Sequence, residues 1–154
     1  MPQILVIGDW QRSEMMPIRG WINGRDSHSI VRQVNDLSAA ATLDPPDLVI
    51  VFQSWPDEFA TSEVAAALGR WPLTLWVCCY GAWCDSDGRN RSIWPISVRV
   101  SVREAEHRLN HVWQVLTEQR GEPLPLTASR DEAFAFDHDA GSFNPAEPSD
   151  NLSR

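Results

Sequence analysis

The sequence contains no lysine, so all 13 of its basic residues are arginines. Schiff-base chemistry, the lysine of a phosphate-binding loop and any phosphoacceptor site that needs a lysine are therefore excluded. The chain also has no basic block, and its net charge of −8 opposes a phosphate backbone. We therefore expect no nucleic-acid binding by this chain.

Long apolar runs and disulfide patterns are also missing. No run approaches the roughly 18 apolar residues of a transmembrane helix, and the first ten residues lack the basic flank and the apolar region of a signal peptide. Three cysteines, at positions 78, 79 and 84, are odd in number and tightly clustered, which fits a reducing compartment. We expect a cytoplasmic protein that does not enter a membrane.

The most informative stretch that is present is PPDLVIVFQSWP, residues 45–56. Residues 48–53 are almost wholly apolar and have proline on either side, a pattern typical of a central strand in a parallel sheet covered by helices. Further strands are predicted at 3–7, 29–34, 73–80 and 96–102, and helices near 18–22, 36–43, 63–68 and 103–120. Asp36 and Ser62 are expected to cap the second and third of these helices, with Ala41 on the inward face of the second and Gly69 at the end of the third. Strands that alternate with helices predict one α/β domain, residues 1–121, with a five-stranded parallel sheet. The alternating segment 96–102 is expected at the edge of that sheet.

Residues 122–154 have a different composition. They hold seven of the 21 acidic residues and four prolines. Such a segment buries too little apolar surface to offset the entropy of ordering, so we expect an acidic, largely disordered tail. The exception is a helical turn over 129–136 that docks Phe134 and Phe136, with disorder beyond Asp137.

Ligands of open parallel sheets bind at the carboxyl ends of the strands, and aromatic side chains gather there in this sequence. Large aromatic side chains are enriched in binding hot spots, but they also serve as plugs over the end of a sheet, and both alternatives stay open here. The candidate binding residues are Asp9, Trp10, Gln53, Trp55, Cys79, Tyr80 and Trp83.

The layout of residues 3–120 resembles the receiver domain of bacterial response regulators. In that family Pro-Asp-Leu leads into the third strand, as at 46–48, and a proline lies four residues after the phosphorylated aspartate. Counting back from Pro56 places Phe52 at the acceptor position. The acidic pair of the family is reduced to Asp9, Cys78 or Cys79 stands near its Thr or Ser, its lysine is missing, and the loop 81–95 replaces one helix.

The resemblance implies a flavodoxin/receiver-like three-layer sandwich that cannot be phosphorylated. Its implied function is that of a degenerate receiver (pseudo-receiver), a regulatory protein-interaction module in bacterial signalling or transcriptional control. Its partner is expected to be a protein that the sequence does not identify, and a homodimer is compatible with the sequence. We expect no enzyme activity, no cofactor and no metal.

The alternative is a small cysteine-dependent or divalent-metal hydrolase or transferase that uses Asp9, Cys79 and the 81–95 loop. Cys84 and Arg89 have the spacing of an anion-binding loop, but Asp85 and Asp87 oppose the positive potential that such a loop needs. His107 and His111 share a helix face, yet two histidines without a third ligand are usually surface residues. The absence of a complete catalytic set favours the regulatory module.

Overall fold

The computed structural model describes residues 1–54, 58–81, 94–95, 97–118, 123–125, 127 and 130–142. Its sheet contains five parallel strands in the order β2-β1-β3-β4-β5. This is the order of the flavodoxin-like doubly wound sheet, so the predicted fold class is confirmed. The strands are β1 (Gln3–Ile7), β2 (Ile30–Val34), β3 (Leu48–Gln53), β4 (Leu75–Tyr80) and β5 (Arg99–Ser101).

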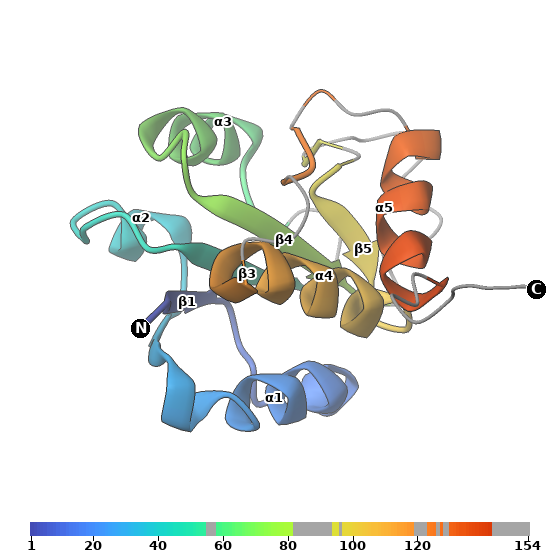
Figure 1. Cartoon of the computed structure of the whole chain (residues 1–154). Helices are drawn as coiled ribbons and strands as arrows, with labels where there is room; N and C mark the ends of the chain where they lie inside the picture. Colours follow the sequence, from blue (N-terminus) through green and yellow to red (C-terminus); the bar gives the residue numbers. More distant parts are fainter. Residues whose placement is uncertain are drawn as a thin grey trace, which may run out of the picture.

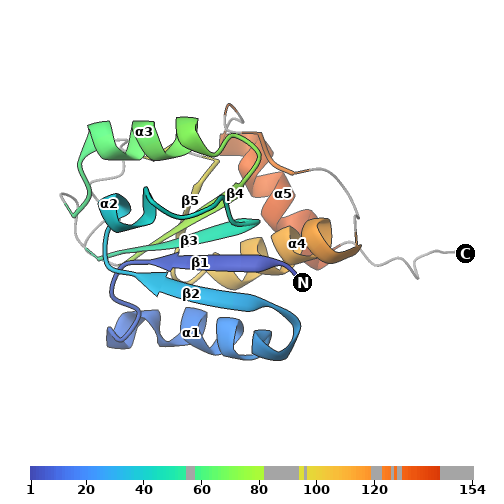
Figure 2. The ribbon, with the colours of Figure 1, turned by 90° about the vertical axis from the view of Figure 1, so that its left-hand side faces the viewer.

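Helices cover both faces of the sheet, as Figures 1 and 2 show. The helices α1 (Met16–Asn23) and α4 (Ala105–Glu118) pack on one face, and α2 (Leu37–Ala40) and α3 (Thr61–Arg70) on the other. Strand β3 is buried along its whole length, because its alternate side chains enter the two core clusters. The prediction of a central strand at 48–53 is therefore confirmed, and β5 is an edge strand as expected.

The sequence predicts some helix ends correctly and others wrongly. The carboxylate of Asp36 accepts a hydrogen bond from the main-chain N–H of Ala39 (2.8 Å) and caps α2 as predicted. Ser62 does not cap α3, because the helix already begins at Thr61 and its first main-chain bond runs from Val64 N to Ala60 O. Gly69 lies inside α3 instead of ending it, and Ala41 is exposed instead of buried.

The tail contains more structure than its composition predicts. Helix α5 (Arg130–Ser142) runs beside α4 and β5 (Figure 1), so the expected disorder directly after Asp137 is wrong as far as Ser142. Phe136 packs against the core, as expected, whereas Phe134 is 63% exposed. Residues 143–154 lie outside the described part of the chain.

Of the helices that the structure describes, none combines the length and the apolar character needed to cross a lipid bilayer.

Candidate functional site at the carboxyl edge of the sheet

The strands β1 and β3 approach each other closely where they end. Gly8 has a φ of 113°, a conformation that favours glycine. A Cβ on this residue would lie 2.7 Å from the main-chain oxygen of Phe52. The phenyl ring of Phe52 is fully buried in the core between the sheet, α1 and α4. The end of the central strand therefore presents an apolar ring to the interior and no carboxylate to the edge.

An arginine links the segments that follow these two strands. The Nη1 group of Arg12 donates to Ser54 Oγ (2.6 Å) and Glu58 Oε1 (3.1 Å), and its Nη2 group donates to Glu58 Oε2 (2.8 Å). Glu58 Oε1 also accepts from the main-chain N–H of Ser54 (2.8 Å). We call this arrangement the Arg12–Glu58 bridge. It ties Ser54 and Glu58 to Arg12.

Asp9 lies beside the Arg12–Glu58 bridge. Its Oδ2 atom is 3.6 Å from Arg12 Nε, and half of its side chain is exposed. The hydrogen bond to Glu58 is the main reason why the pKa of Arg12 lies above its ordinary value, and the charges of Asp9 and Glu14 contribute. The acidic groups at this edge thus already have a cation from the same chain close to them.

The side chain of Gln53, at the end of β3, accepts two further hydrogen bonds beside β4. Gln53 Oε1 accepts from Trp94 Nε1 (2.9 Å) and from Cys78 Sγ (3.7 Å). Trp94 is 1% exposed and packs edge-on against Phe59, with ring centroids 6.2 Å apart. The amide oxygen of Gln53 therefore binds the indole of Trp94 and keeps this ring over the sheet.

Cys79 is an interior residue. Its side chain is fully buried in the core cluster that also holds Phe52. Burial raises the pKa of the thiol from 9.0 to about 12, against a smaller lowering by the charge of Arg108. Because the thiolate is the nucleophile, this cysteine stays inert near neutral pH.

The predicted site residues therefore fall into three groups. Asp9 is exposed, and Trp10 and Tyr80 are half-buried, so these three reach the surface at the carboxyl edge. Gln53 and Cys79 share the edge but point inward. Trp55 and Trp83 lie outside the described residues, as do Cys84 and Asp85.

Sequence reasoning missed Arg12, Glu58 and Trp94. Glu58 and Trp94 form their contacts with residues about 40 positions or more away, so no local pattern marks them. The sequence position alone could have indicated the ion pair. Arg12 and Glu58 each follow the end of a strand, and opposite charges at one edge of a sheet can meet. Trp94 also follows a strand, 14 positions after the end of β4.

The histidines on α4 have separate roles. His107 is exposed, whereas His111 is half-buried and stacks on Phe136 with ring centroids 3.8 Å apart. Its Nδ1 lies 2.7 Å from the main-chain oxygen of Phe136, which only accepts, so Nδ1 carries the proton. The expectation that both histidines are surface residues is wrong for His111. Within the described part of the chain no group of three His, Cys, Asp or Glu side chains is placed to hold a metal ion.

No protein-family model and no curated protein sequence matches this chain. Among solved structures, the chain is similar to the crystal structure of adenylate cyclase from Rhodopirellula baltica. The two are 12% identical with a TM-score of 0.48, and the match covers 77% of this chain and 93% of that one. A similarity with so low an identity and TM-score supports no conclusion about activity.

Proposed function

We propose that this chain is a non-phosphorylatable, receiver-like regulatory domain that acts through contacts with a protein partner. The observation that carries the proposal is the burial of Phe52 at the end of the central strand. A phosphoacceptor must present a carboxylate to solvent at this place, and a phenyl ring packed into the core has no group that accepts a phosphoryl.

The Arg12–Glu58 bridge supports the same proposal. A phosphoryl site needs a divalent cation held by free carboxylates. Here Glu58 is bound by both Nη groups of Arg12, and Asp9 lies 3.6 Å from its Nε. The guanidinium neutralises the charge that would otherwise attract a metal, and it links Ser54 and Glu58 to the residues after β1. The carboxyl edge is thus better suited to contact a protein than to hold a metal ion.

The alternative of a cysteine-dependent or metal-dependent enzyme receives less support. Cys79, its proposed nucleophile, is fully buried and has a pKa of about 12. Asp9, its proposed metal ligand, pairs with Arg12. Two of the three groups that the alternative depends on are therefore occupied or inert.

The test of the proposal is exposure of the purified chain to acetyl phosphate and Mg²⁺, followed by intact-mass measurement. We expect no added mass, because Phe52 replaces the acceptor and no lysine assists a transfer. A typical phosphorylatable receiver treated in parallel confirms that the reagent is active. An acid-labile gain of one phosphoryl group on any aspartate would overturn the proposal.

The partner surface is proposed to include the tryptophans at the carboxyl edge. Trp10 is partly buried and packs on the core, so Trp10→Ala should lower the free energy of unfolding by about 1–3 kcal/mol. Trp55→Ala and Trp83→Ala should change it by less than about 0.5 kcal/mol and weaken partner binding by roughly 1–3 kcal/mol. Thermal melts of the three variants separate the two roles. Losses of about 3–5 kcal/mol for Trp55→Ala and Trp83→Ala would mean that these rings are a plug.

A further inference from the structure

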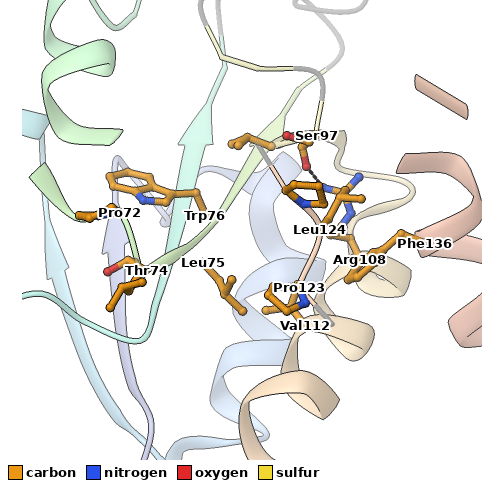
Figure 3. A pocket seen from close by; sticks show the side chains of 13 residues that line it. Pro72, Thr74, Leu75, Trp76, Ser97, Arg108, Val112, Pro123, Leu124 and Phe136 are labelled. Carbon is orange, nitrogen blue, oxygen red and sulfur yellow. Dashed lines mark hydrogen bonds between the residues drawn. The ribbon is translucent and has the colours of Figure 1, made fainter. Parts of the chain in front are cut away.

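The two outer strands of the sheet differ in what lies beside them. On the β5 side, the helix α5 lies next to β5 (Figure 1), and residues 123–125 lie around the same hollow as Leu75 of β4 (Figure 3). On the β2 side, none of the five residues of the strand is buried, and β1 is its one strand partner among the described residues. Figure 2 shows β2 between the layers of α1 and α2. An open strand edge is a template for pairing with another chain, so proteins usually cover or interrupt it.

The main-chain groups of two residues of β2 point away from the sheet. The N–H group of Ile30 donates to the main-chain oxygen of Pro2 (2.9 Å), so the main chain of the even-numbered residues of β2 faces β1. The N–H and C=O groups of Val31 and Gln33 therefore face outward. They have no main-chain partner in the described part of the chain. The edge of β2 thus offers two donors and two acceptors in the spacing that an added strand requires.

The residues of β2 do not interrupt this edge. The strand pairs with β1 over all five residues without a bulge, and it contains neither proline nor glycine. Its one charged side chain, that of Arg32, is exposed and forms no hydrogen bond or ion pair with the described residues. Arg32 pairs with Leu5, which belongs to the core cluster under α2 and α3, so Arg32 lies on that face of the sheet. Helix α2 has only four residues, and Ile30 on the same face is 48% exposed.

The charge of Arg32 determines which strand fits. In an antiparallel pair that uses both Val31 and Gln33, the residue opposite Arg32 belongs to a non-hydrogen-bonded pair, in which the side chains are closest. A second copy of β2 in this register would place two arginines directly opposite each other, which is destabilising. An acidic residue at that position would instead form an ion pair. Asp36 of the same chain does not supply this charge, because its carboxylate caps α2.

We propose that the open edge of β2 binds an extended strand of a protein partner in antiparallel pairing, with an acidic residue opposite Arg32. Main-chain hydrogen bonds to Val31 and Gln33 supply the affinity, and the side chain of Arg32 supplies the selectivity. This edge is separate from the carboxyl edge, so the inference does not depend on the proposed function.

The experiment is an NMR titration of the full ¹⁵N-labelled chain with two capped pentapeptides, acetyl-Thr-Val-Glu-Val-Thr-amide and acetyl-Thr-Val-Lys-Val-Thr-amide. We expect the glutamate peptide to cause saturable shifts of the main-chain amides of Val31 and Gln33. It should bind about fivefold more tightly than the lysine peptide, because opposite charges across a strand pair are favourable and like charges are not. An absence of saturable shifts in residues 30–34, or equal or tighter binding of the lysine peptide, would overturn the proposal.

N-methylated peptides test the main-chain pairing. In the proposed register the N–H groups of the two valines of the peptide face β2, and the N–H group of its central glutamate faces away. Methylation of one valine nitrogen should weaken binding at least about tenfold, because it removes a hydrogen bond and places a methyl group between the strands. Methylation of the glutamate nitrogen is the matched control and should leave binding nearly unchanged. Equal binding of the two methylated peptides would contradict the proposal.

Variants of two exposed arginines test the selectivity. Arg32→Glu should reverse the preference, so that the lysine peptide binds more tightly than the glutamate peptide. Arg103→Glu makes the same change of charge in the turn after β5 and should keep the preference for the glutamate peptide. An unchanged preference in Arg32→Glu, or a reversal in both variants, would mean that Arg32 does not select the strand.

The chain without peptide distinguishes a protein partner from a second copy. Sedimentation equilibrium should show no dimer that forms through β2, because the two Arg32 side chains repel each other. A dimer that Arg32→Glu abolishes or strengthens, together with concentration-dependent shifts at Val31 and Gln33, would show that the edge binds a second copy, and the proposal would be wrong.

Discussion

Asp137→Ala should lower the free energy of unfolding by about 3–5 kcal/mol, the usual loss when one partner of a buried ion pair is removed. Asp137 binds the guanidinium of Arg108 through both carboxylate oxygens, and the two side chains are only 10% and 3% exposed. Without the carboxylate, Arg108 either stays buried as an uncompensated charge or reaches water by releasing α5. Release of α5 also uncovers Ala133 and breaks the contact of His111 with Phe136. Urea unfolding measures the loss.

Two variants control for this result. Asp131→Ala removes an exposed carboxylate from the first turn of the same helix and should cost less than about 0.5 kcal/mol. The double variant Arg108→Met, Asp137→Leu replaces the whole pair with apolar side chains and should recover most of the stability. If Asp137→Ala were as stable as Asp131→Ala, α5 would not depend on the ion pair.

The same ion pair explains why the tail was predicted incompletely. Composition alone gives acidic residues and prolines, which favour disorder. The residue that orders α5 is Asp137, and it stabilises the helix only because its partner, Arg108, is buried 29 positions earlier in the chain. A carboxylate that a composition argument counts toward disorder is thus the one that fixes the helix.

Much of the sheet could be predicted because the signal lies within single segments. The strand 3–7 was placed at its observed bounds, and 48–53 likewise, since runs of apolar β-branched residues need no distant partner to be recognised. The strand predicted at 96–102 is shorter in the structure, where only Arg99–Ser101 pairs with β4. Just before this strand, the main-chain oxygen of Pro95 accepts hydrogen bonds from the N–H groups of Val98 and Arg99.

The candidate site could be predicted in position but not in contacts. The rule that strand ends meet brought Asp9, Gln53 and Cys79 to one edge correctly. It does not say which side chains point outward, because that depends on which face each residue takes and on what covers it. Gln53 and Cys79 face the interior, and Arg12 pairs with Glu58 at the same edge.

Alkaline pH should destabilise the protein through Cys79. The folded state raises the pKa of this thiol from 9.0 to about 12, so the folded chain holds the proton more tightly than the unfolded chain does. The resulting stability is fully present below pH 9 and is lost as the pH rises from 9 toward 12. A difference of three pH units corresponds to about 4 kcal/mol in total, with about 1 kcal/mol lost by pH 10.

The measurement is urea unfolding under reducing conditions at half-unit steps from pH 8 to 11, for the native sequence and for Cys79→Ala. Other groups titrate in this range, but they are common to both proteins, so the difference between the two curves belongs to Cys79. The variant starts less stable because it loses buried volume, and its curve should fall less steeply above pH 9 until the two converge. Parallel curves would mean that the thiol ionises as readily in the folded chain as in the unfolded one. In that case Cys79 would be available as a thiolate, and the cysteine-dependent alternative would regain its nucleophile.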